Sequence, residues 1–406
     1  MPFNEASIHS RLLIGTDEYP RQANLSNMSS PISNIFTQFR HELHRFPEIS
    51  GHEVETQKRI KAFVSQFNPV SIREVGGTGL LLQYGQGTTG PVTLIRADID
   101  ALPIQEVNLV DHKSQNKGVS HKCGHDGHAA ILARLASLLA EKPVSTGRVY
   151  LLFQPAEETG KGAEAVLNDP AFAALRPDRV FALHNLPGYQ EGTIVCKPGS
   201  FTSSVLSMIV SFTGKVSHSA EPEKGLNPAY VLADFMLQTK QIQNPEPQSE
   251  AFALITPIYI TMGEKSYGIS AGYGEVHLTL RTRNAKRMET LKTQLLDLLA
   301  ELSTGSGINV EIAYTEAFFA NENDPQAFSQ IKESAQKLGY PFIEKQEPFK
   351  WGEDFGLFTQ QYPGAMFGIG NGEDSPALHN DNYDFNDNLI EPAAHLFLEL
   401  IKIGHS

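Results

Sequence analysis

The chain has 406 residues, of which 40% are hydrophobic and 19% charged, and its formal net charge is −13. A chain of this length exceeds one ordinary hydrophobic core, so we expect two domains. The negative charge argues against nucleic acid and anionic lipid as partners. No apolar stretch approaches the roughly 18–20 residues of a membrane span, and the N-terminal segment lacks a secretory signal pattern. With only two cysteines, Cys123 and Cys196, the sequence predicts a cytoplasmic protein without a disulfide framework.

The N-terminal part of the chain predicts an extension followed by two helices. Residues 1–30 show no sustained hydrophobic period, which is typical of an N-terminal extension. Ser30 and Pro31 suit an N-cap and a first helical residue, and apolar residues then recur at helical spacing as far as Leu43. A second helix is expected from His52 to about Phe67.

Short apolar runs that each end in a polar cluster then alternate with helical patterns. The runs begin at Val92, Val149, Val180 and Ala365, and helices are expected at 128–141 and 388–403. Buried strands alternating with helices predict an α/β sheet covered on both faces, which we assign to residues 31–200 and 316–406. Ligands bind beyond the carboxyl ends of strands in such sheets, where the polar clusters fall.

Residues 201–315 interrupt this pattern. They offer a strand, a helix, two strands, a helix and a strand, at 205–212, 227–243, 252–262, 275–283, 286–302 and 308–314. The order βαββαβ predicts a ferredoxin-like α+β sandwich with one helical layer. We therefore expect an inserted second domain, with the flanking pieces closing into one core.

The segment HKCGHDGHAA places Cys123 and His125 two residues apart, with Gly124 between them. A thiolate and an imidazole so close together can share one metal ion or bridge to a second. The alternative is a helix N-terminus with incidental polar residues.

The segment QPAEETG places Glu157 and Glu158 after a predicted buried strand. Adjacent side chains at a strand end point in different directions, so one carboxylate can bind metal while its neighbour faces a water. That division suits metal-assisted hydrolysis. On its own, a pair of glutamates is usually a solvated surface.

Further ligand-type residues follow other predicted strands. Asp98 and Asp100 lie in RADID, where a carboxylate can hold a ligating imidazole in its correct tautomer. His184 and His379 stand singly, and a lone histidine is more often structural than a ligand. The convergence of such residues at the strand ends of one α/β core favours a metal cluster.

Rival mechanisms find little support. The sequence has no G-x-S-x-G elbow for a serine nucleophile, and neither a G-x-G-x-x-G nor a Walker loop. Cys123 as nucleophile with His125 as base is disfavoured because residues two apart seldom form that hydrogen bond, and nearby carboxylates oppose thiolate formation.

Seven segments in order carry a family resemblance: RADIDALPIQE, GVSHKCGHDGHAA, LLFQPAEETGKGAEAV, ALHNLPG, GKVSHSAEPEKGLNPA, WGEDF and ALHNDNYDFND. Together they resemble the aminoacylase/carboxypeptidase family of two-metal metallopeptidases. The resemblance is greatest to its amidohydrolase branch, which includes hippurate hydrolases, N-acyl-amino-acid amidohydrolases and indoleacetyl-amino-acid hydrolases. It covers the chain from about Pro31 to the C-terminus.

The resemblance implies roles for individual residues. Two divalent ions (zinc, manganese, cobalt or nickel) would be held by five ligands: Cys123, His125, Glu158, His184 and His379. Cys123 would bridge the ions, and Glu157 would be the general base. Asp100 would be the carboxylate that holds a ligating histidine in its correct tautomer.

The resemblance also implies that His218, in the inserted domain, reaches the active site of a neighbouring subunit and helps to stabilise the tetrahedral oxyanion. The inserted domain would then be both a lid and the surface of a possible homodimer. The alternative for His218 is a surface histidine in a loop.

One stretch departs from the family pattern. Relatives commonly carry an Asn-Val-Ile-Pro-Asp-like segment before the strand that ends at Arg281, whereas this chain reads Gly268-Ile-Ser-Ala-Gly. Gly268 replaces an asparagine that contacts substrate in relatives, while Arg281 and Asn227 match substrate-binding positions. Substrate preference therefore does not carry over from relatives.

Taken together, the sequence predicts a metal-dependent amidohydrolase that splits small, hippurate-like N-acyl amino acids into a carboxylic acid and an amino acid. Two alternatives stay open. One is a carboxypeptidase or dipeptidase acting on small peptides, and the other is a catalytically silent ligand-binding homologue.

Overall fold

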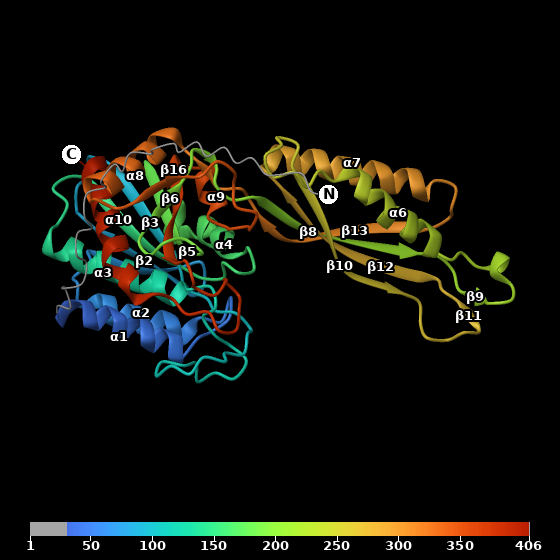
Figure 1. The fold of residues 1–406 in the computed structure, drawn as a ribbon, viewed down its shortest axis with the longest axis horizontal. Helices are drawn as coiled ribbons and strands as arrows, with labels where there is room; N and C mark the ends of the chain where they lie inside the picture. The colour runs from blue at the N-terminus through green and yellow to red at the C-terminus, as the bar shows by residue number, and fades with distance from the viewer. Residues whose placement is uncertain (1–30, 406) are drawn as a thin grey trace, which may run out of the picture.

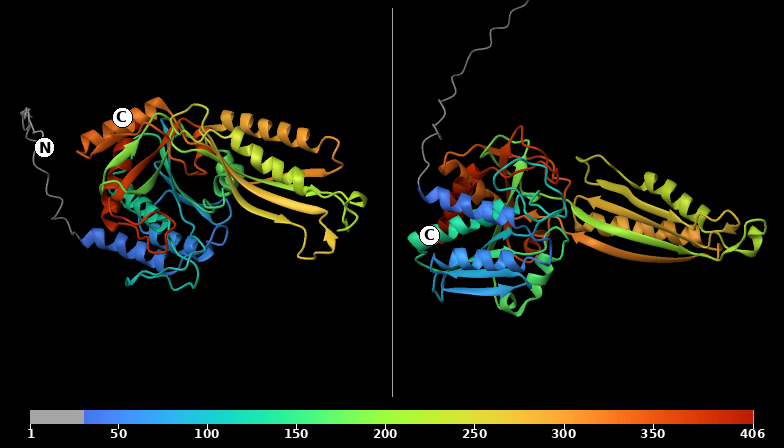
Figure 2. Two further views of the ribbon diagram at one scale, coloured as in Figure 1. Left: turned by 45° about the vertical axis from the view of Figure 1, so that its right-hand side comes forward. Right: turned by 90° about the horizontal axis from the view of Figure 1, so that it is seen from below.

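The computed structural model describes residues 31–405, so the predicted extension at residues 1–30 and the predicted N-cap Ser30 lie outside the described residues. The described chain forms two lobes, which we call the main lobe and the elongated lobe (Figures 1 and 2). In the part of the chain described, no helix has both the length and the apolar character needed to cross a membrane.

The main lobe is built on an eight-stranded mixed sheet. Its strands, in spatial order, are β1 (Ser71–Val75), β2 (Gly79–Tyr84), β4 (Arg148–Gln154), β3 (Val92–Asp98), β5 (Arg179–Pro187), β16 (Gly364–Gly372), β6 (Ile194–Cys196) and β15 (Phe342–Glu344). The central strands β4, β3, β5 and β16 run parallel, so their carboxyl ends meet at one edge of the sheet.

Helices cover both faces of this sheet, because alternate residues of the buried strands are apolar on both sides. In β4, Leu151 and Phe153 join one core and Tyr150 and Leu152 join the other. The first core packs under α1 (Pro31–Arg45), α2 (Val54–Ser65), α3 (His125–Glu141), α8 (Pro325–Lys337) and α10 (Ile390–Gly404). The second packs under α4 (Gly162–Asn168), α5 (Pro170–Ala173) and α9 (Gly356–Thr359).

The elongated lobe has a four-stranded antiparallel sheet with its own apolar core. The strands, in spatial order, are β10 (Ala253–Met262), β12 (Tyr273–Thr282), β8 (Ser204–Thr213) and β13 (Asn309–Phe318). The helices α6 (Ala229–Ile242) and α7 (Ala285–Ser303) form its one helical layer (Figure 1). The chain order of these elements is the predicted βαββαβ.

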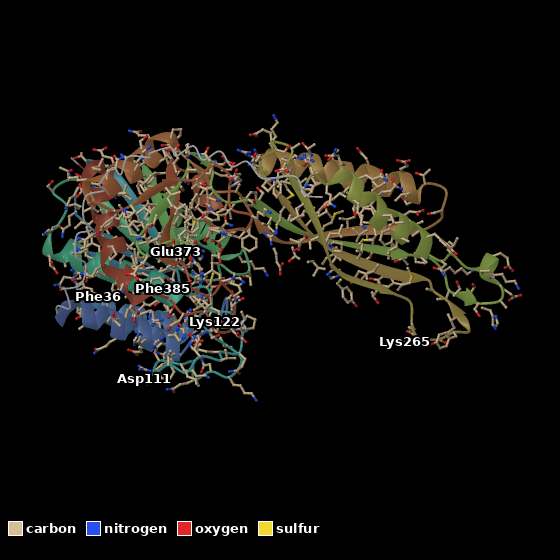
Figure 3. The ribbon with its side chains drawn as sticks, in the orientation of Figure 1. Phe36, Asp111, Lys122, Lys265, Glu373 and Phe385 are labelled. Atoms are coloured by element: carbon tan, nitrogen blue, oxygen red, sulfur yellow. The ribbon has the colours of Figure 1, made fainter. Side chains whose placement is uncertain are left out.

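Two short ribbons add to this arrangement. β7 (Gly199–Ser200) pairs with β14 (Glu322–Asn323), and β9 (Ser217–His218) pairs with β11 (Ile269–Ser270). The β9–β11 ribbon lies at the end of the elongated lobe farthest from the main lobe, near Lys265 (Figures 1 and 3).

Several predicted element limits differ from the structure. The helix expected from residue 128 begins at His125, which places that histidine at the first helical position. The helix expected at 388–403 begins with a 3-10 turn, η2 (Asp387–Leu389). The strands β1, β2, β6 and β15 and the helix α8 were not predicted from the sequence.

Candidate metal centre

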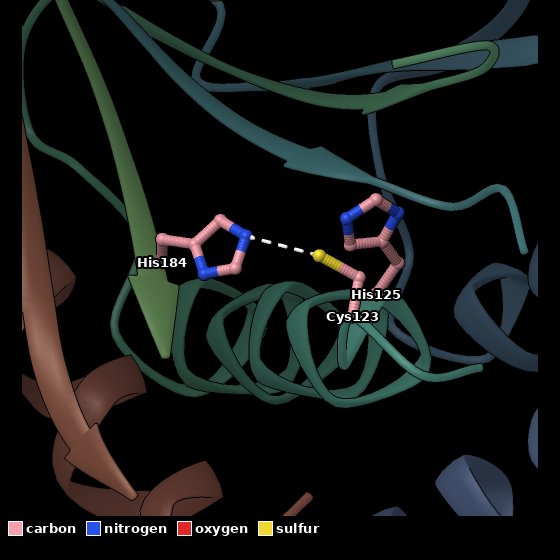
Figure 4. Close-up of side chains that lie close together, drawn as sticks. All are labelled: Cys123, His125 and His184. Atoms are coloured by element: carbon pink, nitrogen blue, oxygen red, sulfur yellow. Dashed lines mark hydrogen bonds between the residues drawn. The ribbon is translucent and has the colours of Figure 1, made fainter. Parts of the chain in front are cut away.

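Cys123 and His125 are set apart by a sharp turn at the start of α3. Gly124 has φ +95°, in the left-handed region, and a Cβ at this position would lie 2.7 Å from the side-chain oxygen of Asn185. Glycine therefore meets both a conformational and a steric requirement. The turn sends the Cys123 thiol and the His125 ring toward the same edge of the sheet (Figure 4).

His184 comes from the carboxyl-end half of β5 and faces Cys123. Its Nε2 lies 3.5 Å from the Cys123 Sγ (Figure 4). Its Nδ1 lies 2.8 Å from the carbonyl oxygen of Asn185, so an Nδ1–H donated there leaves Nε2 free to bind a metal ion.

His379 and Glu158 complete the group. The Nε2 of His379 lies 3.6 Å from Glu158 Oε1, and the Nε2 of His125 lies 3.8 Å from the same oxygen. His379 has φ +66°, an uncommon conformation for a residue with a side chain, and its N–H donates to the carbonyl oxygen of Lys122 at 2.8 Å. The backbone next to Cys123 thus holds the loop that carries His379.

The ligand atoms fall into overlapping groups. Cys123, His125 and His184 have ligand atoms within 4.8 Å of one another, and so do Cys123, Glu158 and His379. Cys123 is common to these two groups, and His125 is also grouped with Glu157 and Glu158.

A metal ion also fits the polar atoms of this site. His125 Nε2 and Glu158 Oε1 are buried and have no hydrogen-bond partner among the described residues. A buried polar atom without a partner is costly, and coordination of a metal ion would satisfy both atoms. The residues present therefore fit two divalent ions.

Asp100 forms hydrogen bonds with two of these residues, His125 and Glu158. Its Oδ1 lies 3.2 Å from His125 Nδ1, and its Oδ2 accepts from Ser50 Oγ at 2.6 Å and from the Glu158 N–H at 3.0 Å. Burial tends to raise the pKa of Asp100, but the hydrogen bonds from His125 and Ser50 outweigh it and hold that pKa below its usual value. An ionised Asp100 leaves His125 Nε2 free for metal.

Glu157 is buried beside Glu158, and its carboxylate takes a different direction. Its Oε1 accepts a long hydrogen bond of 3.4 Å from the N–H of Asp354. Burial raises the pKa of Glu157 well above its usual value, and the charges of Glu353 and Glu158 add to this effect. A carboxylate of high proton affinity is suited to take a proton from water.

Several buried polar residues near the cluster had no predicted role. His128 Nδ1 lies 2.5 Å from Asp98 Oδ1, and its Nε2 lies 2.5 Å from Asn185 Oδ1. Asp98 in turn accepts from Arg96 at 2.6 Å. The available signal was the place of these residues in quoted segments: His128 in HKCGHDGH, Arg96 in RADID and Asn185 in ALHNLPG.

Lys122 is another buried residue that the sequence interpretation left without a role. Its Nζ donates to Glu106 Oε1 at 2.7 Å and to the carbonyl oxygen of Tyr383 at 2.8 Å. Because its own carbonyl oxygen accepts from His379, Lys122 joins three separate segments beside the cluster. A fully buried lysine follows from the tertiary packing and not from the local pattern.

The predicted residues of the elongated lobe lie in two places. His218 is in β9, opposite Ile269 of β11, and Gly268 accepts from the Ser219 N–H at 3.0 Å. Asn227 donates to Ser270 Oγ at 3.1 Å, so these residues share the distal end of the lobe.

Arg281 lies at the opposite end of this lobe. It donates to the carbonyl oxygen of Lys350, and the adjacent Trp351 has its ring centroid 5.3 Å from that of His184. The structure thus brings Arg281 toward the cluster of its own chain. It leaves His218 and Asn227 at the distal end (Figure 1).

Comparison with known proteins agrees with this geometry. The family described as peptidase family M20/M25/M40 matches residues 94–403 of the chain. The chain belongs to this family. Members similar to it include the hippurate hydrolase of Campylobacter jejuni, 28% identical over 372 residues that cover 90% of this chain and 95% of that protein. The N-acetyl-L-cysteine deacetylase of Bacillus subtilis is 29% identical over 394 residues, covering 95% of this chain and 91% of that protein.

The fold is also that of an M20 member. A dinuclear metal-binding peptidase of the M20 family from Bacillus subtilis superposes with a TM-score of 0.78 and 28% identity, covering 91% of this chain and 98% of that one. The predicted family and two-domain α/β fold class are therefore confirmed. The M20 chain is a hydrolase, and its ligand groups together with the dinuclear relative support two divalent metal ions.

Proposed function

We propose that this M20 hydrolase splits the amide bond of N-acyl amino acids of the hippurate type and releases a carboxylic acid and an amino acid. The observation that carries the proposal is the place of Glu157 beside a ligand cluster in which His125 Nε2 and Glu158 Oε1 are buried and have no hydrogen-bond partner among the described residues. The similarity to a hippurate hydrolase and to an N-acetyl-L-cysteine deacetylase supports the substrate class.

The proposed mechanism divides the work among the chain's own residues. Two metal ions would be held by Cys123, His125, Glu158, His184 and His379, and Cys123 would be the ligand common to both. When bound, two such ions polarise the scissile carbonyl and lower the pKa of a water. Glu157 takes the proton from that water and later delivers it to the leaving amine. Asp100 keeps His125 in the tautomer that presents Nε2.

The elongated lobe contributes the remaining proposed contacts. His218 of a second copy would donate a hydrogen bond to the developing oxyanion, with residues 201–315 acting as lid and dimerisation domain. The position of His218 at the distal end of its own lobe supports a role at another copy's site (Figure 1). Arg281 is proposed to bind substrate in its own chain, and Asn227, at the distal end with His218, is proposed to bind substrate at the site of a second copy.

The acyl group of a hippurate is aromatic, and one aromatic side chain is placed to meet it. Trp351 is partly exposed, and its ring centroid lies 5.3 Å from His184 and 5.0 Å from Phe349. An aromatic acyl group gains contact area and ring–ring attraction against such a surface. This supports a benzoyl-type substrate over a small acyl group.

A matched substrate panel tests the proposal. The purified protein is reconstituted with zinc or manganese and assayed on N-benzoylglycine, N-acetylglycine and the dipeptide Phe-Gly, which share the same C-terminal residue. We expect N-benzoylglycine to be hydrolysed faster than Phe-Gly, with Trp351→Leu losing part of the preference for benzoyl over acetyl. Faster hydrolysis of Phe-Gly would contradict the proposal in favour of a dipeptidase. Metal binding without hydrolysis of any substrate would contradict it as well.

A further inference from the structure

The WGEDF segment ends beside the loop that carries both glutamates of the site. We call residues 155–162 the acidic loop; it runs from the end of β4 to the first residue of α4 and includes Glu157 and Glu158. Asp354, two residues before α9, is fully buried against this loop. The acidic residues of WGEDF, Glu353 and Asp354, have no part in the proposed mechanism.

The carboxylate of Asp354 joins the two ends of the acidic loop. Its Oδ1 and Oδ2 each accept from Gln154 Nε2 at 2.9 Å, and Gln154 is the last residue of β4. Its Oδ2 also accepts from the N–H of Ala163 at 2.8 Å, at the start of α4. Both ends of the loop are therefore attached to one buried side chain.

The ends of the loop are also packed directly against each other. The Gly162 N–H donates to the carbonyl oxygen of Ala156 at 3.0 Å, and a Cβ on Gly162 would lie 1.7 Å from the carbonyl oxygen of Pro155. Ala156 has φ +52°, so the backbone entering Glu157 is in an uncommon conformation. Such a conformation persists only where the surroundings hold it.

The backbone of Asp354 reaches the base itself. Its N–H points to Glu157 Oε1 at 3.4 Å, while its side chain holds the ends of the loop. Arg96 holds Asp354 in turn, because the guanidinium Nη2 of Arg96 donates to Asp354 Oδ1 at 2.8 Å. Asp354 therefore contacts the carboxylate of Glu157 through its backbone N–H. Through its side chain it also holds both ends of the backbone segment that bears Glu158.

We infer that Asp354 is a positioning residue that clamps the acidic loop and so places Glu157 and Glu158 relative to the ligands from other strands. The inference rests on the proposed roles of Glu157 as base and Glu158 as ligand. Asp354 acts through these residues, since its carboxylate is committed to Gln154, Ala163 and Arg96.

Asp354→Asn is the direct test, because it keeps the shape of the side chain but replaces one acceptor oxygen by an amide NH2. Both oxygens accept from N–H groups in the structure, so either orientation of the amide sets a donor against a donor. Glu353→Gln is the matched control. Glu353 is also buried and accepts from Arg96 at 2.9 Å, but its other hydrogen bond is to Phe355, outside the acidic loop.

Two readouts on the full chain distinguish positioning from bulk stability. The first is the affinity of the metal-free protein for zinc, measured by competition with a chelator. The second is the separation of kcat from KM on N-benzoylglycine. We expect Asp354→Asn to weaken zinc binding by about tenfold or more. We also expect it to lower kcat by about 10- to 100-fold with little change in KM, while Glu353→Gln keeps the zinc affinity.

The outcomes separate the inference from the proposed function. Equal losses of zinc affinity in the two variants, or an unchanged zinc affinity in Asp354→Asn, would overturn the clamp. The zinc readout does not need turnover, so an inactive wild-type protein would contradict the proposed function and leave the clamp open to the same test. If Asp354→Asn does not fold, Gln154→Leu releases one end of the loop and is expected to lower zinc affinity, and an unchanged affinity there would overturn the inference.

Discussion

Glu157 and Glu158 are neighbours in the chain but lie in different surroundings. The Glu158 carboxylate lies beside two histidine Nε2 atoms, whereas the Glu157 carboxylate faces the N–H of Asp354. The difference follows from their place after a buried strand, where successive side chains point apart. It supports the proposal that Glu158 binds metal and Glu157 transfers the proton.

Glu157→Gln tests that division. The amide keeps the size of the side chain but cannot take a proton, so turnover should fall by about 100- to 10,000-fold. Metal content, measured by elemental analysis on the same sample, should stay at the wild-type level. Glu158→Gln is the paired variant, and it should lose metal. Full turnover by Glu157→Gln would show that another group is the base.

The stability of the chain should depend on pH through His44. This buried residue lies 2.8 Å from Asp126 Oδ2 and 3.1 Å from Glu106 Oε1. Burial and the Arg40 charge lower the pKa of His44, but the two carboxylates outweigh them and raise it to about 9. Its unfolded pKa is about 6.5, so protonated His44 stabilises the fold fully below that pH, and this contribution is lost as pH rises through about 9.

The measurement is the free energy of unfolding between pH 6 and pH 10, taken on wild type and on His44→Gln. Wild type should lose roughly 3 kcal/mol more than the variant across this range, because only the wild-type residue releases a proton on the way. Equal slopes in the two proteins would show that His44 does not titrate in the folded state as described.

Among the elements, the helix α3 carries His125 at its start and packs closely against Phe385 in its first turn. Gly127 lies in its first turn, and a Cβ there would lie 2.4 Å from the ring of Phe385. Phe385 follows the loop that carries His379, so a displaced ring would also disturb that ligand.

Gly127→Ala is therefore expected to lower the free energy of unfolding by about 1–3 kcal/mol through overpacking, despite the better helix propensity of alanine. Metal affinity should fall with it. Gly268→Ala is the control, since a Cβ at Gly268 meets no atom of the described residues within 4 Å. Urea unfolding of both variants checks the prediction, and equal stabilities would contradict it.

Many of the helices and strands could be predicted from the sequence. The buried runs of β3, β4, β5 and β16 and the βαββαβ order of the elongated lobe were predicted, because apolar periodicity reports burial directly. The short strand β15 was not, since one of its residues, Ile343, is exposed, and its pairing with β6 is set by tertiary contacts. The helix start at His125 was missed because Gly124, not a polar side chain, precedes it.

For the candidate site, the ligand-type residues could be predicted from the sequence, but the residues that hold them in place could not. The spacing of Cys123 and His125 and the strand-end rule identified residues that the structure brings together. The partners that hold them were not identified, because Asp354 lies 191 residues from Ala163 and 258 from Arg96. Contacts at such separations leave no periodic signal in a single sequence.

Across the whole molecule, His218 belongs to β9, which lies at the end of the elongated lobe farthest from the main lobe (Figure 1). If His218 acts at the site of a second copy, Glu157→Gln and His218→Ala should complement each other. A mixed dimer would have one site with both residues intact. Random exchange in a symmetric dimer should then restore about a quarter of wild-type activity.

The mixing experiment uses two separately purified variants that each have low activity. Activity is followed after subunit exchange, and light scattering reports the oligomeric state of each sample. An activity of the mixture equal to the mean of the two variants would contradict a role of His218 in a second copy's site.

We propose above that hydrolysis by this chain needs two metal ions, held by Cys123, His125, Glu158, His184 and His379. The most direct measurement is the titration of metal-free protein with zinc or manganese while the hydrolysis of N-benzoylglycine is followed. We expect negligible activity without metal and a rise that levels off at two equivalents per chain. Full activity in the metal-free protein, or a plateau at one equivalent, would contradict it.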